Sequence, residues 1–160
     1  MKRLAGLLIV VALLLPACGP PETVQAELLD LADRYLEARN TFITNAAGSG
    51  IDPTVGMTDA FRERLEADLA VLADRRDGTY ASAETRLTAL SWGYGGDSAT
   101  LVADEHTWLT YVPNDTDTPT DSAYAWERRF EFVRADDGRW VLSADVWPTE
   151  GHGLPETVVT

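Results

Sequence analysis

The chain has 160 residues and a formal net charge of −13, and 45% of its residues are hydrophobic. This composition suits one globular domain with its own core and excludes wholesale disorder. Because the charge is strongly negative and no basic stripe is present, nucleic-acid binding and an electrostatic attachment to anionic lipid are excluded. The single cysteine, Cys18, excludes an intramolecular disulfide and a cysteine-rich zinc site.

The first 18 residues have the layout of an export signal. Lys2 and Arg3 form a basic start, and residues 4–15 form an apolar stretch that is shorter than the roughly 20 residues of a spanning helix. The ending Leu15-Pro16-Ala17-Cys18 resembles the lipobox of bacterial lipoprotein precursors. That resemblance implies a diacylglyceryl group on the Cys18 thiol and cleavage before it. The alternative is an ordinary secreted protein with a cysteine near the cut.

This interpretation divides the chain into four parts. We expect a signal peptide at 1–17, a lipidated tether with little structure at 18–22, a body at 23–148 and a flexible tail at 149–160. Removal of residues 1–17 leaves 11 arginines against 26 carboxylates, a net charge of −15. The expected location is the extracytoplasmic side of the cell membrane, with the lipid as the attachment.

Two long helices are predicted first. Apolar residues recur at spacings of three and four from Val24 to Phe42, and this helix is expected to end near Ala47. Asp52-Pro53 could start a short helical turn. Thr58 or Asp59 then caps a second helix, which ends before Gly78.

Four strands are predicted after Gly78, at about 79–93, 97–112, 123–135 and 139–147, because two-residue alternation appears there. In the third strand Tyr124, Trp126, Arg128, Phe130 and Phe132 are expected to share one face. In the fourth strand the shared face is expected to comprise Trp140, Leu142, Ala144 and Val146.

The stretch 129–142, an aromatic strand that turns through Asp136-Asp137-Gly138 into a strand with Trp140, is similar to the closing hairpin of the nuclear-transport-factor-two-like group. The resemblance covers about 24–147 and implies a cystatin-like α+β cone. We therefore expect two long helices and a short one, packed on one face of a curved four-stranded antiparallel sheet. The group includes isomerase-like and cyclase-like enzymes and non-catalytic modules, so the fold does not decide the function.

The weak catalytic candidates are His106 and Asp104, which share a face of the second strand and could act as a base with a carboxylate partner. An exposed strand histidine is the favoured interpretation. Arg128 interrupts an aromatic face, so it either meets an anionic ligand or pairs with a helix carboxylate or lies at the rim; we favour pairing or the rim. The candidates for lining a pocket are Tyr35, Phe42, Phe61, Trp126, Arg128, Phe130 and Trp140.

We expect no cofactor and no metal, because the acidic loop 113–122 lacks the glycine and terminal glutamate of a calcium-binding loop. The leading hypothesis is a non-catalytic envelope lipoprotein that binds a partner protein or a small apolar ligand through an aromatic-lined cone. The alternatives are an isomerase-like or cyclase-like enzyme using His106 or Asp104, and an accessory subunit of an envelope complex. A second copy bound through the sheet face is a further expected partner.

Overall fold

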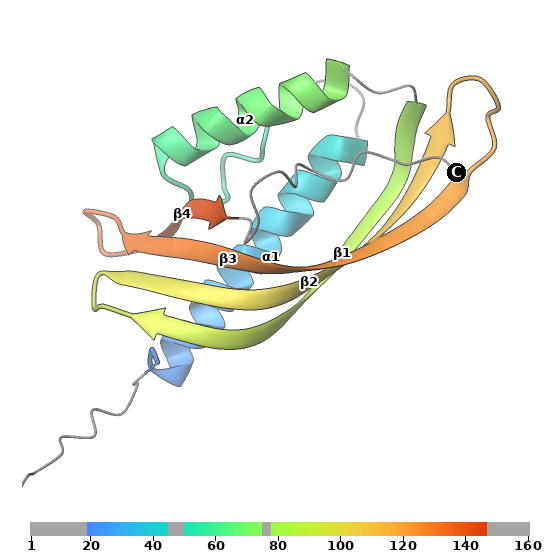
Figure 1. Cartoon of the computed structure of the whole chain (residues 1–160). Helices are drawn as coiled ribbons and strands as arrows, with labels where there is room; N and C mark the ends of the chain where they lie inside the picture. Colours follow the sequence, from blue (N-terminus) through green and yellow to red (C-terminus); the bar gives the residue numbers. More distant parts are fainter. Residues whose placement is uncertain (1–18, 45–49, 75–77, 147–160) are drawn as a thin grey trace, which may run out of the picture.

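The computed structural model describes residues 19–44, 50–74 and 78–146, with the side chains of 72–74 left out. Two helices are followed by four strands, as the sequence predicts (Figure 1). Each strand pairs antiparallel with the next, in the order β1-β2-β3-β4. The elements are α1 (Glu22–Thr44), α2 (Asp59–Asp74), β1 (Gly78–Tyr94), β2 (Ser98–Pro113), β3 (Thr120–Arg134) and β4 (Trp140–Val146).

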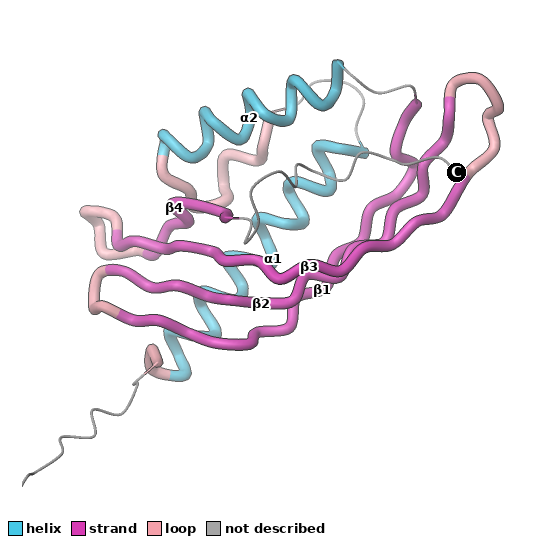
Figure 2. The backbone as a smooth tube through the Cα atoms, in the orientation of Figure 1, coloured by secondary structure: helices cyan, strands magenta, loops and turns pink. Residues whose placement is uncertain are grey.

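The short helix expected at Asp52-Pro53 is not formed. The Asp52 carboxylate instead accepts hydrogen bonds from the backbone N–H of Thr54, at 2.8 Å, and from its hydroxyl, at 2.7 Å. Such a local bond offers the backbone an alternative to a helix. The chain then runs beside β4, where Met57 forms a parallel bridge with Leu142. Residues 50–58 are therefore a turn and an added edge, as Figure 2 shows in pink.

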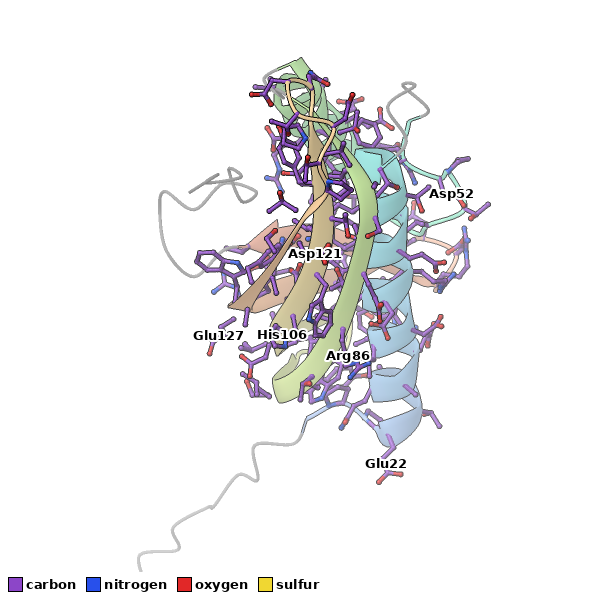
Figure 3. All side chains as sticks on the ribbon, turned by 90° about the vertical axis from the view of Figure 1, so that its right-hand side faces the viewer. Glu22, Asp52, Arg86, His106, Asp121 and Glu127 are labelled. Carbon is purple, nitrogen blue, oxygen red and sulfur yellow. The ribbon has the colours of Figure 1, made fainter. Side chains whose placement is uncertain are left out.

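The two helices cover one face of the curved sheet. α1 packs along β1 and reaches β4, while α2 contacts β4. Seen from the side, α1 lies against one face of the long strands (Figure 3). We call this the inner face of the sheet and the opposite one its outer face. The coarse prediction of an α+β fold with helices on one side of an antiparallel sheet is thus confirmed.

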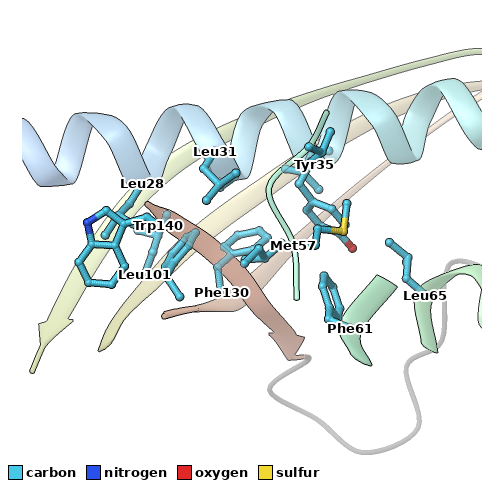
Figure 4. Packing of buried hydrophobic residues seen from close by; sticks show 14 of the residues in the cluster. Leu28, Leu31, Tyr35, Met57, Phe61, Leu65, Leu101, Phe130 and Trp140 are labelled. Carbon is cyan, nitrogen blue, oxygen red and sulfur yellow. The ribbon is translucent and has the colours of Figure 1, made fainter. Parts of the chain in front are cut away.

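The hydrophobic core fills the space between the helices and the inner face (Figure 4). Aliphatic side chains spaced three or four residues apart enter it from α1, and aromatic rings enter it from the sheet. Tyr35 packs against Phe61 of α2 with ring centroids 5.7 Å apart, and against Phe130 at 6.3 Å. The core therefore joins both helices to the centre of the sheet.

The alternation expected in β3 is confirmed, because Arg128, Phe130 and Phe132 are all buried on the inner face. The alternation expected in β4 is wrong beyond Leu142. Phe132 pairs with Leu142, whereas Glu131 pairs with Ala144, so Ser143 is an extra residue in a β-bulge. The bulge places Asp145 opposite the inward-facing Phe130 and turns Ala144 outward.

The segment before α1 is more ordered than the sequence suggests. Pro20 is buried, and its carbonyl accepts a hydrogen bond of 2.8 Å from the Gln25 side chain. A Cβ placed on Gly19 would lie 3.5 Å from the Cβ of Trp92 in β1. Gly19 and Pro20 thus contact the body, whereas the sequence predicted a short tether with little structure. The predicted signal peptide, Cys18 and the tail 149–160 lie outside the described residues. None of the helices in the described ranges is long and apolar enough to cross a membrane.

Candidate functional site: a buried ion network

Four charged side chains from four different elements meet on the inner face. Arg39 comes from α1, Glu105 from β2, Arg128 from β3 and Asp145 from β4. Glu105 lies at the centre and accepts from Arg39 at 2.7 Å and from Arg128 at 2.7 Å. Arg128 also binds Asp145 through both carboxylate oxygens, with Nε 2.9 Å from Oδ1 and Nη2 bound to Oδ2. We call these four residues the ion network.

The helix geometry explains why Arg39 reaches the sheet. Residues four apart lie on the same face of a helix, so Arg39 continues the buried row that includes Leu31 and Tyr35. The Tyr35 hydroxyl donates to the Asp145 Oδ2 at 2.8 Å, which ties the same face of α1 to β4. The same face of α1 therefore contributes Leu31 and Tyr35 to the hydrophobic core and Arg39 to the ion network.

Hydroxyls and one amide surround Glu105 and Arg39. The Thr107 hydroxyl donates a hydrogen bond to the Glu105 carboxylate at 2.8 Å and forms another, also of 2.8 Å, with the Thr85 hydroxyl. The Asn40 side-chain amide donates to the same Thr85 hydroxyl at 2.9 Å. The half-buried Tyr124 donates its hydroxyl to Glu105 at 3.2 Å. Because buried polar groups are costly when unpaired, this shell is what makes so many charges tolerable inside the body.

The network holds its central carboxylate ionised. Burial alone would raise the pKa of Glu105, but the charges of Arg39 and Arg128, together with hydrogen bonds to the carboxylate, outweigh burial and lower the pKa to about 2. Burial would lower the pKa of the Arg39 guanidinium, but Glu105 outweighs it and the pKa is raised. Burial and the adjacent Asp145 raise the pKa of the Tyr35 hydroxyl well above its usual value.

These values limit the chemistry available on the inner face. A carboxylate with so low a pKa is a poor proton acceptor near neutral pH and does not donate a proton there. Two carboxylates neutralise the two guanidinium groups, so neither arginine offers a free charge to an anionic ligand. Within the described ranges no group of three or more histidine, cysteine or acidic residues could hold a metal ion.

His106 and Asp104 lie on the outer face, where both are exposed. Figure 3 shows His106 on the side of the sheet away from α1. Its ring contacts Trp108, with centroids 4.7 Å apart, and the guanidinium of Arg86 lies 5.8 Å from the Trp108 ring centroid. The structure therefore brings His106 next to an aromatic and a cation, and it does not direct His106 toward the core.

The candidates for lining a pocket divide into two groups. Tyr35, Phe61, Phe130 and Trp140 are buried in the core, whereas Phe42 and Trp126 are half-buried. Arg128 is buried in the ion network and pairs with carboxylates of two strands, so neither the expected helix partner nor the rim position is found.

Sequence reasoning missed Arg39, Glu105 and Asp145. Arg39 could have been found from the sequence, because it lies at a helix position whose neighbours one turn apart are apolar and buried. Glu105 likewise occupies the buried phase of β2, between Ala103 and Thr107. A charged residue at a position that faces the core predicts a buried partner of opposite charge. Asp145 carried no such signal, because only the bulge at Ser143 turns it inward.

The fold is similar to that of solved structures, although the sequences are far apart. The intermembrane space region of the chloroplast protein ARC6 superposes with a TM-score of 0.56 at 12% identity, covering 80% of this chain and 97% of that one. A structure from Catenulispora acidiphila has a TM-score of 0.44, 19% identity and coverage of 77% and 88%. Another from that organism, in complex with S-DNPA, has a TM-score of 0.46, 19% identity and coverage of 79% and 92%.

The two Catenulispora similarities are too distant to carry an argument. No protein-family model and no curated protein matches the sequence. What the comparisons establish is the α+β fold, shared with the ARC6 region over nearly the whole of that region.

Proposed function

We propose that this chain is a lipoprotein anchored on the extracytoplasmic side of the cell membrane by lipid on Cys18, with a non-catalytic body that binds a partner protein. The observation that carries the proposal is the ion network. Its paired charges and the hydrophobic core lie on the inner face, where a cone-shaped enzyme of the nuclear-transport-factor-two-like group would hold its substrate. We assign the body to that group as part of the same proposal.

The outer face supports a partner protein as the ligand. Trp108 is 38% exposed there, beside His106 and Arg86. Aromatic and arginine side chains are enriched at the centres of protein interfaces. A small apolar ligand is the second candidate, and the half-buried Phe42 and Trp126 on the helix side of the sheet favour it. A subunit role in an envelope complex is one form of the first candidate.

The anchor is tested by Cys18→Ser in the full chain. We expect the wild type in the membrane fraction and the variant released, because the thiol that would carry the lipid is gone. Pro16→Ala is the matched control, since it alters the lipobox but keeps the thiol, and it should stay in membranes. Retention of Cys18→Ser, or an unmodified residue 18 in the mass spectrum of the wild type, would contradict the anchor.

The binding surface is tested by crosslinking in intact membranes followed by purification in detergent. We expect Trp108→Ala to lose a crosslinked species that the wild type forms, and Thr88→Ala, an exposed neighbour on the same face, to keep it. The same crosslinking is carried out with Trp126→Ala, which alters the inner face instead. Loss with Trp126→Ala and retention with Trp108→Ala would contradict the outer face as the binding surface. No crosslinked species in the wild type, with an apolar molecule that copurifies with the wild type and is lost with Trp126→Ala, would favour the small apolar ligand instead.

A further inference from the structure

The start of the described chain lies beside the end of β1. Gly19 lies beside Trp92, since a Cβ on Gly19 would be in van der Waals contact with the Cβ of Trp92, at 3.5 Å. The next residue, Pro20, is buried and hydrogen-bonded to Gln25 in the first turns of α1. Figure 2 shows the chain entering α1 beside the lowest strand of the sheet, which is β1. The body therefore has almost no free chain between its first helix and residue 18.

The covalent backbone limits how far residue 18 can lie from the body. Consecutive Cα atoms are about 3.8 Å apart, so residue 18 cannot lie farther than that from Gly19. Acyl chains on Cys18 would thus leave the protein one residue before Gly19, the residue that contacts Trp92. A long flexible tether would let the body rotate freely above the membrane. Here only residues 19–21 separate residue 18 from α1, so that freedom is restricted.

The surface around Trp92 is apolar in a way that fits this position. Leu90 is 50% exposed and Tyr94 is 39% exposed. Both lie two residues from Trp92, which is about 7 Å along a strand. Leu90 is the extra residue of a β-bulge, since Ala89 and Ser91 pair with adjacent residues of β2. Tyrosine favours the membrane–water interface, so Tyr94 and Leu90 are the exposed side chains that suit it, while Trp92 is half-buried and packs against the core.

We propose that the segment Leu90–Tyr94, the membrane-contact segment, lies in the interfacial layer of the bilayer as a second attachment of the body. This inference rests on the proposed lipid on Cys18. The contact is apolar rather than electrostatic, because the nearby first turn of α1 carries Glu22 and the chain as a whole is acidic. Neutral phosphatidylcholine is therefore a sufficient partner.

The orientation that follows sends the other end of the body away from the membrane. β2 is 16 residues long, about 50 Å when extended, and it leads from the membrane-contact segment to the loop after Pro113. Trp108 lies on the outer face near that far end. The proposed protein-binding surface would thus stand clear of the lipid, accessible to a partner in the envelope.

The test uses the full, lipidated chain in phosphatidylcholine vesicles that contain a nitroxide-labelled phosphatidylcholine. Cys18 is the only cysteine, and a lipidated Cys18 has no free thiol, so a fluorescent maleimide will label an introduced cysteine alone. Labels are placed by Leu90→Cys, by Glu84→Cys on the same strand, and by Thr116→Cys in the far loop. All three native side chains are exposed, and the thermal unfolding of each variant is compared with that of the wild type.

We expect lipid quenching of the label to be several-fold stronger at position 90 than at 116, with position 84 between them. Equal quenching at 90 and 116, in protein whose Cys18 carries lipid by mass spectrometry, would overturn the membrane-contact segment and leave the anchor standing. An unmodified Cys18 would instead overturn the anchor and, with it, this inference. Mass spectrometry of the same samples distinguishes the two failures.

Discussion

Glu105 is the residue on which the interior depends most. It is fully buried, and it accepts hydrogen bonds from both arginines of the ion network and from Thr107. Its substitution would leave Arg39 without its carboxylate partner while Arg128 kept Asp145. The cost of such a change comes mainly from the charge that is left behind in the interior.

Glu105→Gln should therefore lower the free energy of unfolding by about 3–5 kcal/mol, the range measured when one partner of a buried ion pair is removed. Chemical denaturation followed by circular dichroism measures it. Asp104→Asn is the matched control, because Asp104 is adjacent in β2 but exposed, and it should change stability by less than about 0.5 kcal/mol. Equal effects of the two variants would show that the ion network does not stabilise the body.

The stability of the folded protein should fall as the pH is lowered, because of Glu105. The pKa of Glu105 falls from 4.5 to about 2 on folding, so the unfolded chain binds the proton more readily than the folded one. The stabilisation, about 3 kcal/mol for such a difference, is complete above pH 4.5 and is lost as the pH falls toward 2. Wild type and Glu105→Gln should thus converge in stability between about pH 5 and pH 2. A constant difference across that range would contradict the low pKa.

The entry into α2 shows how a local signal and a tertiary contact combine. Thr58 caps the helix, as predicted, because its hydroxyl accepts from the backbone N–H of Phe61 at 3.3 Å. The same residue donates its own N–H to the Leu142 carbonyl of β4 at 2.9 Å. Arg62 then binds the carbonyls of Ile51 and Val55, at 3.2 and 2.8 Å, and holds the preceding turn. The cap was readable from sequence, whereas the pairing with β4 was not.

Thr58→Ala should cost about 1 kcal/mol of stability, since it removes the capping oxygen and leaves the backbone bond to β4 in place. Thr58→Ser retains that oxygen and should recover most of the loss. Urea denaturation of the two variants beside the wild type measures the difference. An alanine variant as stable as the serine variant would show that the hydroxyl does not act as a cap.

The two C-terminal strands differ in how well two-residue alternation predicts the face on which a residue lies. Two-residue alternation placed every inward residue of β3 correctly, from Tyr124 to Phe132. In β4 the same rule failed after Leu142, because a bulge adds one residue and shifts the phase of everything after it. Asp145 therefore became the partner of Arg128, although sequence alternation put it on the opposite face.

At the scale of the whole molecule, the predicted homodimer would join two outer faces. The outer face presents Glu84, Asp104 and Glu127 around Arg86, so two such faces would oppose mostly like charges. A homodimer through this face, if it forms around Trp108, should strengthen as salt screens the carboxylates. Sedimentation of the Cys18→Ser protein at low and high salt measures this. Association that weakens with salt would indicate that ion pairs hold the dimer.

The sequence by itself determined the element order, the antiparallel hairpins and the faces of the residues of β3, because these depend on periodicity and turn chemistry within a few residues. It also carried the lipobox pattern that predicts the anchor at Cys18. Only the tertiary structure decided that Arg39, Glu105, Arg128 and Asp145 meet, and that Gly19 packs on Trp92. Both depend on contacts between residues far apart in the chain and on a one-residue bulge, and no local pattern records such distances.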